Sequence, residues 1–221
     1  DAVVKSAPAD LDALLAAPYP NSDKTVGEMI PEKVLVIGEN LKVRRFTRYC
    51  TGVTVPYIHM AGRIGVLVNM EVEGIEASAV TELGKDLCMQ VAAMNPSFCD
   101  KADVDQATLD KEKEIQLALM DNDPKMASKP LQVKEKIVLG KMSKYYEENC
   151  LMQMEFVKEK GVSVEQHVAA VAKELGGKIA VKSFVRFERG EGIEKKQEDF
   201  AAEVAAPLNR GQYPAWCRLR Q

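Results

Sequence analysis

Apolar residues recur with helical spacing at two places in the first half of the chain. Residues 1–29 have this spacing, and the PYPNS stretch at residues 18–22 divides them into two predicted helices. Ser22 or Asp23 is placed to cap the second of these helices. The spacing returns over residues 78–94, whose apolar residues share one stripe: Val80, Leu83, Leu87, Val91 and Met94.

Strand patterns lie between these two helical regions. Residues 41–49 are rich in β-branched, aromatic and arginine residues. Residues 53–59 and 64–70 flank a short turn at residues 61–63 (AGR), which is the pattern of a β-hairpin. The first part of the chain is therefore predicted to contain helices followed by an antiparallel sheet.

The density of charge sets residues 103–149 apart from the rest of the chain. Residues 101–148 hold nine lysines and ten acidic residues, and the apolar positions among them form only a narrow seam. The seam residues are Ile115 and Leu119 on one segment and Val133, Ile137 and Met142 on the next. This pattern is typical of a protruding helical hairpin or antiparallel coiled coil, although two ordinary surface helices packed on the main body would produce it as well.

Two stretches of the chain have the same order of residue types, VRRFTRY at residues 43–49 and VKSFVRF at residues 181–187. The second belongs to a predicted strand at residues 179–188, which follows a predicted helix at residues 164–175. Period two would place Ile179, Val181, Val185 and Phe187 on one face of this strand and Lys182, Phe184 and Arg186 on the other. The repeat suggests two related halves.

We therefore expect an α+β protein with two related halves and a charged helical arm inserted in the second. The expected parts are an N core subdomain at residues 1–77, a C core subdomain at residues 78–194 with the arm at residues 103–149, a terminal helix at residues 195–206 and a tail at residues 207–221. The tail has no periodicity, and we expect it to be disordered or foreign to the fold.

The composition is that of a globular protein. The 221 residues have a hydrophobic fraction of 46%, and 30 basic against 33 acidic residues give a net charge of −3. The longest apolar runs have five residues, so no membrane-spanning helix is predicted. Five cysteines without a C-x-x-C spacing indicate a reduced, cytoplasmic chain. The first residue is Asp1 and no targeting segment follows it, so we expect a piece of a longer chain.

Motifs for catalysis, metal binding or nucleotide binding are missing from the sequence. Only His59 and His167 could serve as imidazole bases, and neither lies in a known catalytic motif. Three aspartates at residues 100–105 lack the glycine and glutamate of a calcium loop. No phosphate-binding glycine motif is present. We expect no cofactor, no metal and no enzymatic activity.

A basic segment is the one feature that favours nucleic-acid binding. Residues 38–63 carry five basic residues and one acidic residue, and Phe46 and Tyr49 lie among them. A basic sheet with exposed aromatic side chains would suit RNA. The acidic net charge favours structural ion pairs or a protein contact instead, and we expect no direct contact with nucleic acid.

Several blocks of the sequence resemble the elongation factor Ts family, in the order in which that family has them. The blocks are IGEN at 37–40, VRRF at 43–46, GRIGVLV at 62–68, MQVAAMNP at 89–96, EKIVLGKM at 135–142, ENCL at 148–151, FVK at 156–158 and FVRFERGEGIEK at 184–195. The resemblance implies an α+β fold with two related core subdomains, each with a small antiparallel sheet and helices, an inserted helical coiled-coil arm in the second, and a C-terminal helix that docks on the partner.

The resemblance also implies a function. Members of the family bind elongation factor Tu with GDP, disturb its magnesium and phosphate site and release the nucleotide. A protein that binds the nucleotide-free partner more tightly than the GDP form lowers the affinity for GDP, and it needs no covalent chemistry. The alternatives that stay open are an RNA-binding module that uses the basic sheet and a structural fragment that dimerises through residues 103–149. The sequence also leaves open whether the chain forms a homodimer.

Three features depart from the family pattern. The N-terminal three-helix module and the Thr-Asp-Phe-Val segment that precedes the core are not in this sequence, and we expect a chain without that segment to bind the partner but to exchange nucleotide poorly. Many members carry a histidine where this chain has Gln90, which can donate and accept hydrogen bonds but cannot become cationic.

Seven positions correspond to family positions that face the partner: Ile64, Gly65, Gln90, Val157, Lys158, Phe200 and Val204. The resemblance implies that the first three face the nucleotide-binding domain of the partner, the next two face its other domains, and the last two lie on the docking helix. Ile64 and Val157 could equally be core residues, Gly65 a requirement of the sheet, and Lys158 a solvated side chain.

Overall fold

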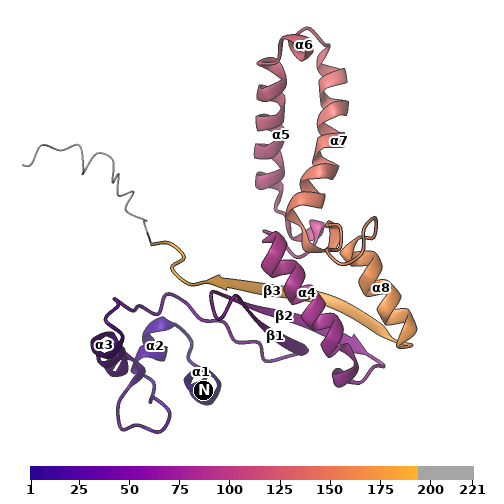
Figure 1. Cartoon of the computed structure of the whole chain (residues 1–221). Coiled ribbons are helices and arrows are strands. Elements are labelled where there is room, and N and C mark those ends of the chain that lie inside the picture. The colour runs from indigo at the N-terminus through magenta and orange to yellow at the C-terminus, as the bar shows by residue number, and fades with distance from the viewer. Residues whose placement is uncertain (194–221) are drawn as a thin grey trace, which may run out of the picture. The chain divides into compact units, whose positions relative to one another are not determined.

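The computed structural model describes residues 1–193, and residues 1–189 form one unit of it. This part of the chain is α+β, with eight α-helices and one three-stranded antiparallel sheet (Figure 1). The predicted terminal helix and tail, with Phe200 and Val204, lie outside the described residues. No helix within residues 1–193 is long and apolar enough to span a membrane.

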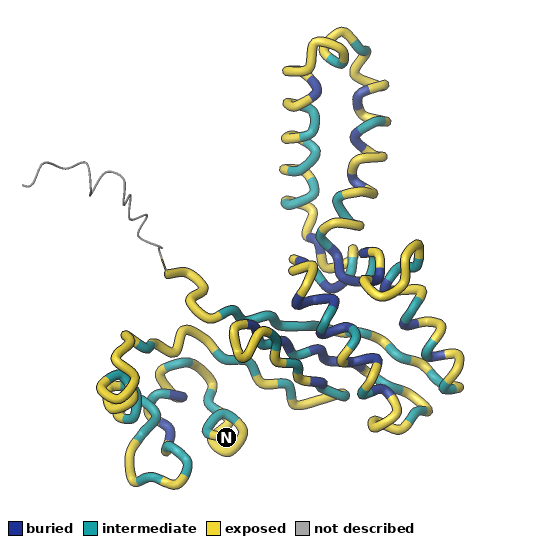
Figure 2. Tube along the Cα trace, in the orientation of Figure 1, coloured by how far each residue is buried: buried dark blue, intermediate teal, exposed yellow. Residues whose placement is uncertain are grey.

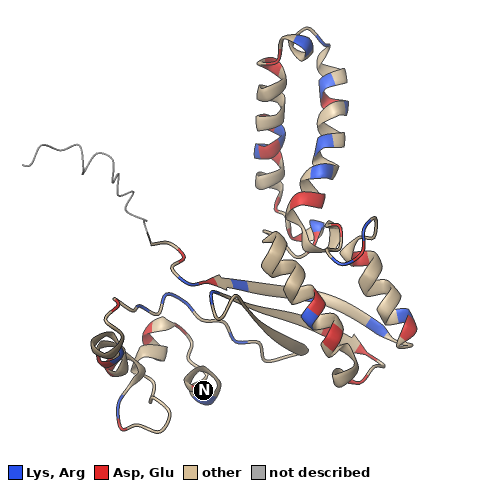
Figure 3. Ribbon diagram, in the orientation of Figure 1, with Lys and Arg blue, Asp and Glu red and all other residues tan. Residues whose placement is uncertain are grey.

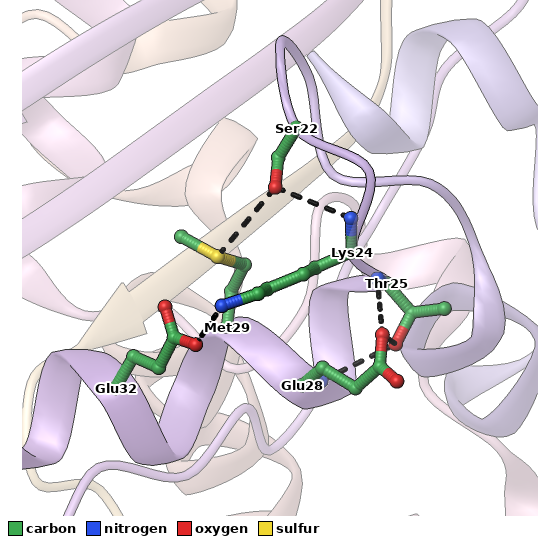
Figure 4. Close-up of polar contacts among 6 residues, drawn as sticks. All are labelled: Ser22, Lys24, Thr25, Glu28, Met29 and Glu32. Atoms are coloured by element: carbon green, nitrogen blue, oxygen red, sulfur yellow. Dashed lines mark hydrogen bonds and ion pairs between the residues drawn. The ribbon is translucent and has the colours of Figure 1, made fainter.

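Three helices open the chain: α1 (Ala2–Ser6), α2 (Leu11–Ala16) and α3 (Val26–Ile37). The cap of α3 is Thr25 and not Ser22 or Asp23, because Thr25 and Glu28 form a capping box. Its Oγ1 accepts from Glu28 N at 3.3 Å, and Thr25 N donates to Glu28 Oε2 at 2.7 Å (Figure 4). The hydrogen bonds that Thr25 N and Thr25 Oγ1 donate to Glu28 Oε2 lower the pKa of the Glu28 carboxyl.

Lys24 also supports the start of α3, because its Nζ forms an ion pair with Glu32, and Ser22 Oγ accepts from Lys24 N at 3.2 Å (Figure 4). The helix continues to Ile37, eight residues beyond the predicted end, and stops at Gly38 with a φ of 78°.

The sheet has the order β1-β2-β3 and consists of β1 (Val53–His59), β2 (Ile64–Glu73) and β3 (Lys178–Glu188). The predicted hairpin is confirmed, with β1 paired to β2 from Val53↔Met70 to His59↔Ile64. Its turn needs positive φ at Met60, Ala61 and Gly62 (50°, 51° and 89°). β3 comes from the second half of the sequence, so within the described residues one sheet joins both halves, in place of the two small sheets that we expected.

A bulge in β3 overturns the predicted faces of that strand. Asn69 pairs with Ser183 while Met70 pairs with Val181, so Lys182 is an extra residue without a counterpart on β2. The extra residue shifts the alternation, and Ile179, Val181 and Phe184 pack together on the core. Val185 and Phe187, predicted to share a face with Val181, point to the opposite side.

The strand predicted at residues 41–49 is wrong, and this stretch has no regular secondary structure. Its contact with the sheet is made by a side chain: Arg45 Nη2 donates to Arg186 O at 3.1 Å, and the guanidinium carbon lies 4.5 Å from the centre of the Phe187 ring. The repeat in the sequence therefore corresponds to one strand and one irregular segment.

One face of the sheet carries the hydrophobic core. The predicted helix at residues 78–94 is confirmed as η1 (Ala77–Val80) followed by α4 (Thr81–Met94), which packs on β1 and β2. α8 (Val164–Glu174) packs on β3. The buried positions gather where these helices meet the sheet (Figure 2). Fully buried side chains in this core include Val68, Met70, Leu87, Val91 and Leu151.

Residues 106–149 form the predicted helical hairpin. α5 (Gln106–Asp121) and α7 (Leu131–Asn149) lie side by side, and α6 (Pro124–Ala127) forms the tip between them (Figure 1). Positively and negatively charged residues both lie along the two long helices (Figure 3). Two 3-10 helices, η2 (Lys101–Asp103) and η3 (Leu151–Gln153), lie at its base.

The seam of the hairpin differs from the predicted one. Ile137 and Met142 lie in it as predicted, together with Leu109, Leu117, Met120, Met126, Val138 and Tyr145. Ile115, Leu119 and Val133 are exposed instead (44%, 56% and 40%). Lys134 is 8% exposed, and its Nζ donates to Asp121 Oδ1 at 2.5 Å and to Ala127 O at 3.0 Å. A lysine thus takes a buried position near the tip, because a carboxylate and a carbonyl satisfy its charge.

Candidate functional site

The described residues of the candidate site centre on the loop of residues 155–162, which joins η3 to α8. The ends of the loop are held together by Phe156 N donating to Val162 O at 2.8 Å and Val164 N donating to Met154 O at 2.9 Å. Gly161 N donates to Glu155 Oε1 at 2.6 Å, and Gly161 has a φ of 80°. The loop is therefore a compact turn with its own hydrogen bonds.

Phe156 anchors this loop in the core. Its side chain is 3% exposed, and its ring stacks on the ring of His167 with centroids 4.1 Å apart and an interplanar angle of 18°. The other histidine, His59, lies with Nδ1 3.0 Å from the hydroxyl of Tyr57. Both histidines thus have structural contacts.

Gln90 connects helix α4 to the loop. It is fully buried, and its Nε2 donates to Glu155 O at 3.0 Å while its Oε1 accepts from Val157 N at 2.8 Å. Both ends of the side-chain amide are satisfied by backbone groups of the loop. A buried amide left without these partners would cost about 1–3 kcal/mol, so the arrangement is strongly determined.

Asp86 provides a second connection from the same helix. Lys158 Nζ lies 2.7 Å from Asp86 Oδ1, and the two side chains are 50% and 15% exposed. An ion pair this open to solvent contributes at most about 1 kcal/mol, so it aligns the loop more than it stabilises it. Sequence reasoning missed Asp86, although it stands four residues before Gln90 and therefore on the same helix face.

Val157 is the apolar residue that this loop exposes. Its side chain is 47% exposed. The residues around it are held in place, because Phe156 is buried in the core, Glu155 O accepts a hydrogen bond from Gln90, and Lys158 forms an ion pair with Asp86. The structure therefore brings together three of the predicted residues, Gln90, Val157 and Lys158.

Ile64 and Gly65 lie elsewhere, at the start of β2. Ile64 is 6% exposed and belongs to the core, and Gly65 pairs with Ile58 and Phe187. A Cβ atom at Gly65 would meet only Ile58 Cδ1, at 3.6 Å, so the fold does not demand glycine there. Ile58 and Met60 are the apolar side chains exposed at this end of the hairpin (67% and 58%).

The described residues offer little reactive chemistry. Burial raises the pKa of the Cys88 and Cys99 thiols to about 12 and that of Cys150 to about 11, so all three are neutral near pH 7. Within residues 1–193, no group of three or more His, Cys, Asp or Glu residues could hold a metal ion.

Comparison with known proteins agrees with the blocks quoted above. The family model described as Elongation factor TS matches residues 1–191. Elongation factor Ts of Clostridium kluyveri is 46% identical over 186 residues, which are 83% of this chain and 59% of the relative. That of Clostridium perfringens is 46% identical over 187 residues (84% and 60%), and that of Syntrophotalea carbinolica is 40% identical over 206 residues (92% and 67%). The chain thus spans about three fifths of the length of its clostridial relatives, and it belongs to the elongation factor Ts family.

Proposed function

We propose that the chain binds elongation factor Tu and promotes the release of GDP, so that GTP can take its place during translation in the cytoplasm. The observation that carries this proposal is the family match over residues 1–191, most of the described chain. The absence of a metal cluster within residues 1–193 is compatible with action through binding alone. The free energy for exchange would come from a higher affinity for nucleotide-free elongation factor Tu than for the GDP form.

We propose the seven predicted positions as the partner-binding set. Val157 and Lys158 support this best, because both are exposed on a loop that is tied to the core. Gly65 is half-buried and lies beside exposed Ile58 at the end of the β-hairpin, where apolar surface is accessible. Ile64 would shape this end from within the core. Phe200 and Val204 complete the set through the proposed docking helix.

The division into two core subdomains, at residues 1–77 and 78–194, is part of the same proposal, as is a coiled-coil arm at residues 103–149. The narrow seam between α5 and α7 supports the arm. β3, from the second half, pairs with β2, from the first, so the two subdomains would share a sheet.

A binding experiment tests the proposed function through linkage. If the chain lowers the affinity of elongation factor Tu for GDP, then GDP must lower the affinity for the chain by the same factor. We expect calorimetric titration of the 221-residue chain to give a dissociation constant at least about tenfold lower for nucleotide-free elongation factor Tu than for the GDP form. Release of a fluorescent GDP analogue should accelerate with a chain extended upstream through the Thr-Asp-Phe-Val segment, and much less with the 221-residue chain. Equal affinities for the two forms would contradict the proposal.

Variants of the loop sharpen this experiment. Val157→Ala removes apolar contact area from the proposed interface and should weaken binding several-fold. Val133→Ala is the matched control, because Val133 is a valine of similar exposure on α7 (40% against 47%). A control variant that weakened binding as much as Val157→Ala would speak against the proposed site.

RNA binding is the second candidate function, and one observation favours it. Arg44, Arg45, Phe46 and Arg48 line a hollow of about 520 Å³ beside residues 8–11. Contacts with phosphate weaken steeply with salt. Titration of a labelled single-stranded RNA at two salt concentrations would detect such binding, and no binding at low salt would exclude it.

A further inference from the structure

Gln90 is placed to act on the partner indirectly. Because the side chain is fully buried in the free protein, no atom of it is offered to another molecule. Its two polar groups are directed to the backbone of residues 155 and 157, at 3.0 Å and 2.8 Å. Whatever Gln90 contributes to recognition must therefore pass through the loop.

The side-chain amide of Gln90 makes the two hydrogen bonds that the backbone of an adjacent β-strand would make to the loop. The C=O of residue 155 and the N–H of residue 157 flank Phe156 on one side of the chain, and a single amide satisfies both. The reverse orientation of the amide would set two donors and two acceptors against each other, so its direction is determined. Phe156 itself is buried and stacked on His167. The backbone before and after Phe156 is thus held by α4, while its ring is held by α8.

We infer that Gln90 is a positioning residue that holds residues 155–158 in the conformation that presents Val157 and Lys158 to elongation factor Tu. Asp86 assists one helical turn earlier through its ion pair with Lys158. The inference rests on the proposed function and deepens it, because it gives Gln90 the role of supporting the binding surface from within the core.

The test variant is Gln90→Met, in which a side chain of similar length fills the space and makes neither hydrogen bond. In the free 221-residue chain, we expect amide hydrogen exchange at Val157 to become at least about tenfold faster, because its N–H loses its acceptor. The dissociation constant for nucleotide-free elongation factor Tu should rise by about fivefold to tenfold, while exchange in the β1–β2 hairpin stays unchanged.

A conservative variant supplies the rescue. In Gln90→His, a neutral imidazole offers one donor and one acceptor, whereas the imidazolium offers two donors and cannot accept from Val157 N. We expect Gln90→His to bind elongation factor Tu nearly as well as the wild type at pH 8, and to lose that rescue as the pH falls through about 6. The wild type and Gln90→Met are measured over the same pH range as controls, because a pH dependence that they share comes from groups other than residue 90.

A double-mutant cycle separates positioning from direct contact. If Gln90 acts through the loop, Gln90→Met and Val157→Ala affect binding less than additively. Additive losses, or unchanged binding by Gln90→Met, would overturn the inference. If the wild-type chain failed to bind elongation factor Tu, the proposed function would fall, and hydrogen exchange in the free chain would still decide the role of Gln90 in holding the loop. Unchanged exchange at Val157 in Gln90→Met would overturn that role.

Discussion

At the scale of single residues, burial separates the positions that shape the molecule from those that contact solvent. Gln90 and Lys134 are both buried polar residues, and each is satisfied by hydrogen bonds to segments more than five residues away. The sequence identified Gln90 through a family resemblance, and the predicted apolar stripe of this helix did not include it. Periodicity also placed Ile115 in the hairpin seam, where the structure has it exposed.

The buried thiols lead to a prediction about reactivity. Burial raises the pKa of Cys88, Cys99 and Cys150 above the ordinary thiol value, whereas Cys50 is exposed. At pH 8, we expect iodoacetamide to alkylate Cys50 and to leave the other three intact, as read by mass mapping of peptides. In 6 M urea Cys88, Cys99 and Cys150 should react as well. Alkylation of Cys88 under native conditions would contradict the assigned burial.

The same pKa shifts affect stability at high pH. The folded state holds these protons more tightly than the unfolded chain, so it binds more protons between the ordinary thiol value of 9.0 and about 12. The free energy of unfolding should therefore fall as the pH rises above about 9.

At the scale of elements, close packing decides where helices can lie. Helix α4 approaches β1 so closely that a Cβ atom on Gly84 would lie 2.4 Å from Val55 Cγ2 and 2.7 Å from Val55 Cβ. Nothing lies within 4 Å of the corresponding position on Gly140 in α7. The two helical glycines thus have different roles, although the sequence alone does not distinguish them.

These glycines provide a matched pair of variants. Gly84→Ala should destabilise the protein by about 1–3 kcal/mol, because the added methyl group forces Val55 to move. Gly140→Ala should stabilise it by about 0.5–1 kcal/mol, because alanine favours the helix and meets open space. Urea unfolding followed by circular dichroism measures both. Equal effects of the two changes would contradict the packing of α4 on β1.

At the scale of the whole molecule, residues 1–189 contain two separate hydrophobic clusters. One lies between the sheet, α4 and α8, and the other lies within the helical hairpin. The base of the hairpin is pinned where Ser97 N and Phe98 N donate to Asn149 O, at 2.9 Å and 3.0 Å. Because the two hydrophobic clusters are separate, the sheet core should fold without the hairpin.

Excision of the hairpin tests this independence. A variant with residues 106–148 replaced by a short Gly-Ser linker should keep the sheet core, seen as unchanged amide chemical shifts for β1, β2 and α4. Light scattering of the intact chain and of this variant tests dimerisation through the hairpin. If the hairpin forms the dimer interface, the intact chain should self-associate and the variant should be monomeric. General loss of chemical-shift dispersion would show that the two clusters fold together.

The sequence by itself determined the elements whose signals are local. The hairpin at residues 53–70, the helix at residues 78–94 and the helical hairpin near residues 103–149 follow from periodicity and turn residues, and the structure has them. The blocks at positions such as residues 62–68 were also sufficient to indicate the family. Local patterns suffice here because helix spacing and turn conformation depend on neighbours in the chain.

Tertiary structure alone decided what depends on distant partners. Residues 41–49 have a strand pattern but no regular strand, and the Lys182 bulge sends Phe184 to the core in place of Phe187. The burial of Gln90 against the loop at residues 155–157 joins segments 65 to 67 residues apart. Such contacts depend on packing and hydrogen bonding between segments that are far apart in the sequence, so the spacing of residue types along the chain does not predict them.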